Sequence, residues 1–240
     1  MTAVDPGIQV ALFTEVSGPV FVAEAARRLA DADAADVLSW AAATFHDWVV
    51  AASMGDTVVA HLASRIAPGV EVLFLDTGYH FPETLGTAEA VRASYPLTLT
   101  VLTPEHSVAE QDATLGPRLH ERDPARCCAL RKTAVLDQGL QGRQAWVTGA
   151  RRVETRNRAD LPLVQWDQRR GLVRLNPLAA WTDDDVATYA EEHEVILNPL
   201  LSAGYPSIGC APCTRPVAAG EDPRSGRWAG IGKTECGILL

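Results

Sequence analysis

The sequence has no apolar run that approaches the roughly eighteen residues of a membrane span, and its first residues, MTAVDPGIQV, lack the features of a signal peptide. We therefore expect a cytoplasmic protein that does not enter the membrane. Positive charge is also scarce: 21 Lys and Arg residues stand against 30 Asp and Glu residues, which leaves a net charge of −9. Because phosphate backbones are held by Lys and Arg, this balance argues against a general nucleic-acid binder. It still allows a local basic pocket for a small anion.

The chain shows no internal repeat and no clear interdomain linker, and its 240 residues suit a single α/β domain. We expect one domain over 1–240, with an α/β core from about 45 to 197 and an irregular tail over 198–240. This division rests on composition. From about Asn198 the chain becomes rich in Gly, Pro, Cys and Arg and loses its periodicity.

Short apolar runs alternate with segments of helical periodicity. Strands are expected at 47–53, 69–76, 97–103, 144–150 and within 171–181, and helices at 22–46, 54–66, 81–95, 127–140 and after the N-cap Thr182. The polar, Arg-rich residues 151–170 are expected to form a loop. This alternation predicts a Rossmann-like, mostly parallel sheet with helices on both faces. Since ligands bind beyond the carboxyl ends of such strands, the loops 53–56, 76–84 and 149–158 are expected to meet at one crevice.

Cysteine is scarce, and its five copies are unevenly placed. Two stand side by side in DPARCCALRK, two form a Cys-x-x-Cys pair in GCAPCTRP and one stands alone in KTECGILL; they are Cys127, Cys128, Cys210, Cys213 and Cys236. In a reducing compartment, clustered thiols more often indicate a metal site or catalysis than a disulfide. The two pairs could hold a zinc ion or an iron–sulfur cluster. Alternatively, the tandem pair consists of small buried apolar residues on a helix.

Cys236 stands close to the last residue and has no cysteine near it in sequence. One interpretation is an incidental surface thiol. The other is a nucleophile on a mobile arm, because terminal segments are often mobile. Glu235 disfavours the reactive thiolate form, whereas cations favour it. The cations nearest in sequence are Lys233, Arg215, Arg224 and Arg227.

Six stretches together resemble the assimilatory adenosine 5′-phosphosulfate (APS) reductases. These thioredoxin-dependent enzymes are related to phosphoadenosine phosphosulfate reductases and have an ATP-pyrophosphatase-like (adenine nucleotide alpha hydrolase) fold. The stretches are LFLDTGYHFPET, RCCALRK, VTGARR, NPLAAWTDDDV, GYPSIGCAPCTRPVAAGEDPRSGRW and KTECGI. The resemblance runs from about residue 45 to the end. The combination of Cys-Cys, Cys-x-x-Cys and Glu-Cys-Gly is highly specific, whereas any one of them alone is weak.

The resemblance implies an enzyme whose 45–197 core binds a nucleotide. It implies reduction of APS to sulfite and AMP by thioredoxin, through an S-sulfocysteine on Cys236, in sulfate assimilation toward cysteine. It also implies one [4Fe–4S] cluster per chain, ligated by Cys127, Cys128, Cys210 and Cys213. Reductases for the 3′-phosphorylated substrate generally lack these pairs, so the unphosphorylated ribose is favoured. No redox domain follows Leu240, so we expect a separate reductant protein; a homo-oligomer stays open.

The anionic phosphosulfate requires cations near the attacking thiolate. The candidates are Lys132, Arg224 and Arg227, with Arg151 and Arg152 as further donors; the alternative is that these are solvated surface charges. Lys132 stands one helical turn beyond Cys128, so one helix is expected to connect cluster and pocket. At the other strand ends, Ser53 is expected to hydrogen-bond the phosphosulfate from a degraded pyrophosphate loop. The nucleotide pocket is expected to be shaped by Asp76, Thr77 and Gly78.

One position departs from the family pattern. The terminal motif of the family continues as Glu-Cys-Gly-(Leu/Ile)-His, whereas this chain has Leu239 at the last of these positions. The His would be expected to help bind or polarise the substrate. The departure therefore bears on how efficiently the tail acts on the substrate. It leaves Cys236 as the expected nucleophile.

Three alternative functions compete with this interpretation. A reductase for the 3′-phosphorylated substrate would share most of the motifs. An ATP-dependent RNA-thiolation enzyme with a four-cysteine zinc site would need an intact pyrophosphate loop and usually a basic surface. A non-catalytic domain with structural cysteines would leave Cys236 and the arginines around it without a role.

Overall fold

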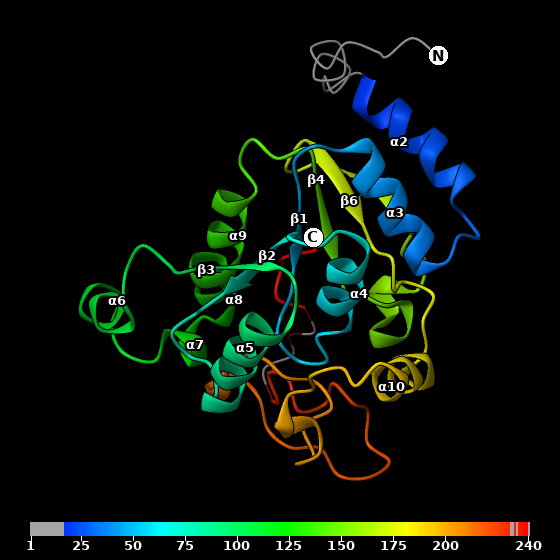
Figure 1. The fold of residues 1–240 in the computed structure, drawn as a ribbon. Helices are drawn as coiled ribbons and strands as arrows, with labels where there is room; N and C mark the ends of the chain where they lie inside the picture. Colours follow the sequence, from blue (N-terminus) through cyan, green and yellow to red (C-terminus); the bar gives the residue numbers. More distant parts are fainter. Residues whose placement is uncertain (1–16, 231–232, 234, 240) are drawn as a thin grey trace, which may run out of the picture.

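A computed structural model describes residues 17–230, 233 and 235–239. These residues form one six-stranded sheet in the order β3-β2-β1-β4-β6-β5 (Figure 1). Its strands are β1 (Trp48–Ala51), β2 (Glu71–Leu75), β3 (Thr98–Leu102), β4 (Ala145–Thr148), β5 (Val164–Asp167) and β6 (Leu172–Leu175). All neighbouring strands are parallel except β5 and β6, which are antiparallel. The predicted mostly parallel α/β sheet is confirmed.

Helices lie at each of the expected places. They are α2 (Ser17–Arg28), α3 (Ala34–Thr44), α4 (Val58–Ile66), α5 (Pro82–Ser94), α6 (Val108–Leu115), α7 (Leu119–Arg122), α8 (Pro124–Cys128), α9 (Ala134–Gly139) and α10 (Asp183–Glu192). The expected helix over 22–46 is two helices, however, and α6 and α7 were not expected. A π-helical turn, Ala129–Thr133, joins α8 to α9, so the expected helix over 127–140 is one continuous helical run. Thr182 caps α10 through a capping box with Asp185, as its sequence predicts. Within the described part of the chain, no helix is long and apolar enough to cross a membrane.

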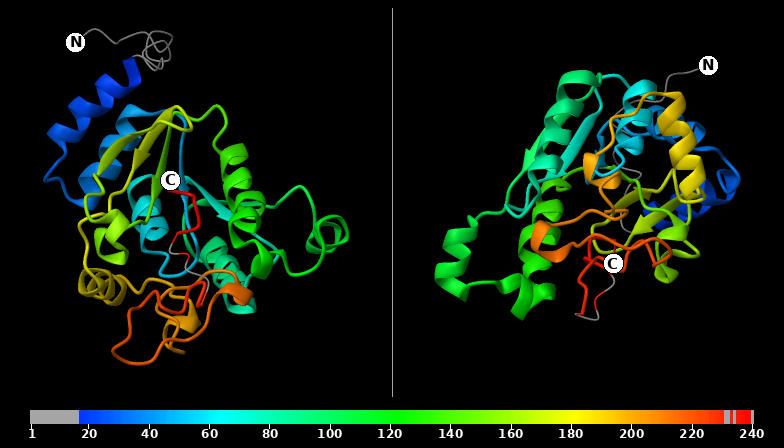
Figure 2. Two further views of the ribbon diagram at one scale, coloured as in Figure 1. Left: turned by 180° about the vertical axis from the view of Figure 1, so that it is seen from behind. Right: turned by 90° about the horizontal axis from the view of Figure 1, so that it is seen from below.

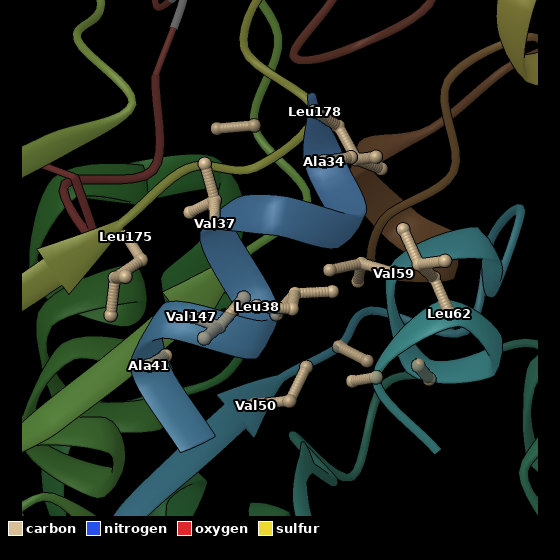
Figure 3. Packing of buried hydrophobic residues seen from close by; sticks show 14 of the residues in the cluster. Ala34, Val37, Leu38, Ala41, Val50, Val59, Leu62, Val147, Leu175 and Leu178 are labelled. Atoms are coloured by element: carbon tan, nitrogen blue, oxygen red, sulfur yellow. The ribbon is translucent and has the colours of Figure 1, made fainter. Parts of the chain in front are cut away.

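Side chains of the central strands alternate between the two faces of the sheet. Val50 and Val147 face the larger core, where Val37 and Leu38 of α3 pack over them (Figure 3). The next residues back along the same strands face the other way, because successive strand side chains point to opposite faces. Helices α3, α4 and α5 therefore cover one face.

The opposite face is covered by α9 and by the end of the chain. Here Trp146 of β4 is fully buried and packs in a second core with Leu136 and Leu140 of α9. Ile238 and Leu239 pack against this same core. Figure 2 shows the C-terminal segment running across the sheet beside α9. The last residues of the chain are thus part of the packed structure.

The predicted loop over 151–170 is wrong in its last third, because Val164–Asp167 form strand β5. The strand pairs with β6 through a tight hairpin, in which Gly171 has a φ of +66°. Two of its four residues, Gln165 and Asp167, are polar, so the sequence shows no apolar run there. An edge strand of this kind is stabilised by its hydrogen-bonded partner more than by its own propensity.

The order of the strands creates the switch point at which α/β proteins bind ligands. Strands β2 and β3 follow β1 on one side, and β4 and β6 lie on the other. Since β1, β2 and β4 are parallel, the loops that follow them leave the same edge of the sheet. In Figure 1 the segment from about residue 200 to 230 lies below this edge.

Asn198 fastens the C-terminal segment to this edge. Its side chain is 1 % exposed. Its amide nitrogen donates to the Met54 carbonyl at 3.0 Å and to Thr84 Oγ1 at 3.1 Å, and its oxygen accepts from the Leu200 N–H at 3.1 Å. We expect Asn198→Ala to lower the free energy of unfolding by about 1–3 kcal/mol, because these buried groups lose their partners. Urea titration, compared with the exposed control Asn157→Ala, measures this loss; equal midpoints would contradict it.

Candidate active site

The structure brings the two cysteine pairs together. Cys127 and Cys128 end α8, Cys210 precedes the short turn Ala211–Cys213, and Cys213 ends that turn. All four line one small cavity of about 10 Å³. None of them forms a disulfide. Two segments some eighty residues apart in sequence thus present four free thiols to one space.

The loop after β2 holds the two segments in register. The Thr77 hydroxyl lies 3.3 Å from Cys210 Sγ, and the Ala211 N–H donates to the Tyr79 carbonyl at 2.7 Å. From the other segment, buried Arg131 donates through Nε to the Thr77 carbonyl. The loop is therefore bonded to both cysteine segments, which explains how the fold places them side by side.

Burial keeps the thiols of Cys127 and Cys213 protonated when nothing positive binds them. The pKa of Cys127 is raised to about 12 by burial and by the neighbouring sulfurs of Cys128, Cys210 and Cys213. Burial and the same crowding raise the pKa of Cys213 to about 11. Thiolates at this spacing need a cation to hold them. The donor set thus suits iron or zinc, both of which bind thiolate sulfur.

Two residues that line the cavity each have one polar atom without a hydrogen-bond partner within the described chain. These atoms are His120 Nδ1 and Arg227 Nε, and both are buried. Buried polar atoms without a partner are rare, and a bound ion, ligand or water accounts for them where they occur. Among the residues described, no three His, Cys, Asp or Glu side chains are arranged to hold a single metal ion. In a cubane, each thiolate binds a different iron, so its four ligands lie farther apart than those of one zinc ion.

Lys132 lies near both the cysteine cavity and the nucleophile predicted from the sequence. It stands in the π-helical turn after Cys128 and lines the same cavity. Burial would lower its pKa, but the nearby sulfurs of Cys210, Cys236 and Cys128 raise it overall. The ammonium therefore stays charged between the paired cysteines and Cys236. This is the position in which the sequence analysis expected a cation.

Cys236 lies against this same turn. A Cβ on the following Gly237 would be 3.7 Å from Thr133 Oγ1, next to Lys132 in the chain. The Cys236 sulfur also interacts electrostatically with Arg227 and with Arg158. The predicted nucleophile is thus partly buried and surrounded by cations.

Arg224 and Arg227 converge on one hydroxyl. Arg224 Nη1 donates to Ser207 Oγ at 3.4 Å, and Arg227 Nη1 donates to the same oxygen at 3.2 Å and to the Ile208 carbonyl at 3.1 Å. The Arg227 guanidinium also lies over the Trp228 ring, 4.6 Å from its centroid. Burial and the neighbouring Arg224 lower the pKa of Arg227. The structure thus gathers both predicted arginines beside the cysteine cavity.

Arg151 and Arg152 are engaged elsewhere in the structure. Arg151 Nη2 forms an ion pair with Asp183 Oδ1 at 2.7 Å, at the first turn of α10. Arg152 Nε donates to the Leu161 carbonyl at 2.8 Å. Both side chains hold the loop after β4 in place, and neither lines the cysteine cavity.

The remaining predicted residues lie at the strand ends. Ser53 follows β1, and its side chain is exposed. Asp76 Oδ1 accepts the Gly78 N–H at 2.9 Å, and Gly78 has a φ of +72°, so these two residues form a tight turn. Thr77 is buried, and its hydroxyl contacts Cys210, which lines the cysteine cavity. The turn at Gly78 also fits closely against Arg131, whose Nη2 would lie 3.1 Å from an added Cβ.

Sequence reasoning missed the residues that bind the tail. Arg158 and Thr155 contact Glu235, and Arg170 and Arg174 donate to backbone carbonyls near the C-terminus. An Arg-rich stretch over 151–170 was the only signal. It could not reveal these partners, which lie 65 to 80 residues away in sequence.

Comparison with known proteins identifies the family. The phosphoadenosine phosphosulfate reductase domain matches residues 47–216. The chain belongs to this family. An adenosine 5′-phosphosulfate reductase of Streptomyces coelicolor is 59 % identical over 89 % of the chain and 91 % of that protein. One of Mycolicibacterium smegmatis is 54 % identical over the same shares. The resemblance seen in the sequence motifs is confirmed.

Solved structures agree with this assignment. A phosphoadenylyl-sulfate reductase from Candida auris, crystallised with phosphate, has a TM-score of 0.72 and 29 % identity, covering 82 % of this chain and 96 % of that one. An FMN adenylyltransferase from Candida glabrata reaches a TM-score of 0.55 at 14 % identity, covering 84 % and 69 %. The second likeness shows a shared fold alone. The predicted Rossmann-like fold of the family is thereby confirmed.

Proposed function

We propose that this chain is an APS reductase that releases sulfite and AMP, with Cys236 as its nucleophile and reduced thioredoxin as its electron donor. The single observation that carries the proposal is the cysteine arrangement: four thiols line one cavity, and the fifth interacts electrostatically with Lys132, which lines the same cavity. High identity to proteins named APS reductase over nine-tenths of the chain supports the substrate and the role in sulfate assimilation.

In the first step, the Cys236 thiolate attacks the sulfur of the phosphosulfate anhydride. The bond from sulfur to the bridging oxygen breaks, and its electron pair leaves with AMP. A thiosulfonate remains on Cys236. Lys132 and Arg227 both interact electrostatically with Cys236, and their charge offsets the negative charge of the incoming anion and of the departing phosphate.

In the second step, a thioredoxin thiolate attacks Cys236 Sγ. Sulfite leaves with the electron pair of the S–S bond, and a mixed disulfide forms. The second thioredoxin thiol then resolves this disulfide. Two electrons thus pass from two thiols to the substrate sulfur, which balances the reduction of sulfate to sulfite.

The four paired cysteines, Cys127, Cys128, Cys210 and Cys213, are the proposed ligands of a [4Fe–4S] cluster. Their free thiols, their shared cavity and the unpaired buried donors around it support this assignment. Once bound, the cluster would join the two segments covalently and contribute its charge to the field around Lys132. Because the thiol pathway already carries both electrons, we propose that the cluster would act through its charge and would pass no electron.

Substrate specificity follows from the same comparison. The relatives of highest identity given above are named for APS, and this chain has both cysteine pairs. We therefore propose that the ribose is recognised without a 3′-phosphate. Arg224, Arg227 and Ser53 are proposed to contact the phosphosulfate, and Asp76, Thr77 and Gly78 to shape the nucleotide pocket. Arg151 and Arg152 are proposed to act indirectly, by holding the loop after β4.

Purification without oxygen, followed by metal analysis and an activity assay, tests this function. We expect about four irons and four sulfides per chain. With thioredoxin present, we expect sulfite release from APS to be at least about a hundredfold more efficient than from its 3′-phosphorylated analogue. Zinc without iron would overturn the cluster, and preference for the analogue would overturn the substrate. No sulfite from either compound would overturn the activity. Cytoplasmic location stays a prediction from the sequence.

A further inference from the structure

The end of the chain is fixed to the protein on both sides of Cys236. On the N-terminal side, the Glu235 carboxylate accepts hydrogen bonds from Arg158 Nε at 2.8 Å and Arg158 Nη2 at 2.7 Å. Thr155 Oγ1 adds a third bond at 2.9 Å. The Glu235 side chain is 8 % exposed, so this ion pair is largely shielded from water. Two parallel bonds from one guanidinium fix the orientation of a carboxylate as well as its position.

The ion pair is itself held in place. Arg158 also forms an ion pair with Glu154, four residues earlier in the chain. Burial would raise the pKa of Glu235, but the hydrogen bonds and charge of Arg158 lower it overall, so the carboxylate stays ionised. A buried ion pair with good geometry helps to specify one conformation. Removal of one partner leaves an uncompensated buried charge.

On the C-terminal side, the backbone is bonded to two arginines. Arg170 Nη1 donates to the Ile238 carbonyl at 3.1 Å, and Arg174 Nη1 donates to the Leu239 carbonyl at 2.8 Å. The side chains of Ile238 and Leu239 pack against the second core beside Trp146. Leu239, which stands where the family pattern has His, thus contributes an apolar contact.

Cys236 and Gly237 lie between these two attachments. Gly237 has a φ of +85°, a backbone conformation that glycine adopts readily and that turns the chain there. With both flanks attached, the Cys236 sulfur is held beside Lys132. We propose that Glu235 and Arg158 are positioning residues that, together with the attachment of Ile238 and Leu239, hold Cys236 in place for its attack on the substrate.

This inference rests on the proposed function and adds a consequence for its two steps. Attack on the phosphosulfate needs a thiolate held at a fixed position, because a well-placed nucleophile avoids the entropy cost of finding its target. The second step needs a protein thiol to reach the Cys236 sulfur instead. Loosening the Glu235 attachment should therefore slow the first step and leave the second unchanged or faster.

Alkylation of Cys236 tests the attachment without any substrate. The variants are Glu235→Gln and Arg158→Gln, and the matched control is Glu221→Gln, an exposed glutamate of the same tail. The rate of modification by iodoacetamide is followed by peptide mass spectrometry across a pH series. The rate at high pH, where the thiol is fully ionised, reports access alone. Because the two variants change the local charge in opposite directions, a rise in both plateau rates indicates loss of docking.

We expect both plateau rates to rise about tenfold, since each variant removes charged hydrogen bonds. In single-turnover experiments with APS, we expect the S-sulfo form of Cys236 to accumulate about tenfold more slowly in Glu235→Gln. Cleavage of the preformed intermediate by thioredoxin should be no slower than in the wild type. Unchanged plateau rates in both variants, or equal slowing of both steps, would overturn the positioning role. If the wild type forms no S-sulfo adduct, the proposed function fails, and the alkylation result still decides the attachment.

Discussion

Cys236→Ser is expected to abolish sulfite release and to leave the iron content unchanged. A serine hydroxyl remains protonated at neutral pH and is a weak nucleophile without a neighbouring base. We expect kcat/KM to fall by more than about a thousandfold. The four cysteines that line the cavity are untouched, so iron and sulfide should match the wild type. Sulfite release and metal analysis on the same anaerobic sample measure both quantities.

The intermediate gives a second readout of this variant. Wild-type protein mixed with APS in the absence of thioredoxin should gain the mass of one SO₃ group, located by peptide mapping on Cys236. The serine variant should gain none while still binding the nucleotide. Full activity in Cys236→Ser, or an adduct on another cysteine, would exclude Cys236 as the nucleophile.

Cys213→Ser is expected to lose the iron that Cys236→Ser retains. Its thiol lines the cavity with the other three and has a pKa of about 11, because burial and the neighbouring sulfurs disfavour its thiolate. A serine oxygen is a poorer ligand for iron, so we expect most of the iron and sulfide to be lost. Activity should be lost as well, because Lys132 and Cys210 line the same cavity and would no longer be held in register.

Stability provides an independent measure of that loss. Ligation would connect the end of α8 to the turn after Cys210, so metal binding should add to the folding free energy. We expect the wild type to unfold at higher urea concentration than Cys213→Ser, and Cys236→Ser to behave like the wild type. Full iron occupancy in Cys213→Ser would show that this residue is not a ligand. Together, the two serine variants separate the nucleophile from the ligands.

The sequence by itself determined the fold class and the family. Strands with central apolar residues, such as Val49 and Val50, are buried on both faces of a parallel sheet, and this burial requires the apolar runs that the sequence shows. The N-cap at Thr182 was also predictable from the sequence, because capping depends on residues within one helical turn. The cysteine motifs indicate the family because their combination is specific to it.

The tertiary structure alone decided how distant segments meet. Strand β5 exists because β6 pairs with it, and its own residues carry little apolar signal. The pairing of Glu235 with Arg158 joins residues 77 positions apart, a separation at which no local pattern can act. Leu239 could be identified from the sequence as a departure from the family, but its packing against the second core depends on where α9 and Trp146 lie. Local signals specify elements and motifs; contacts between elements are set by how those elements pack.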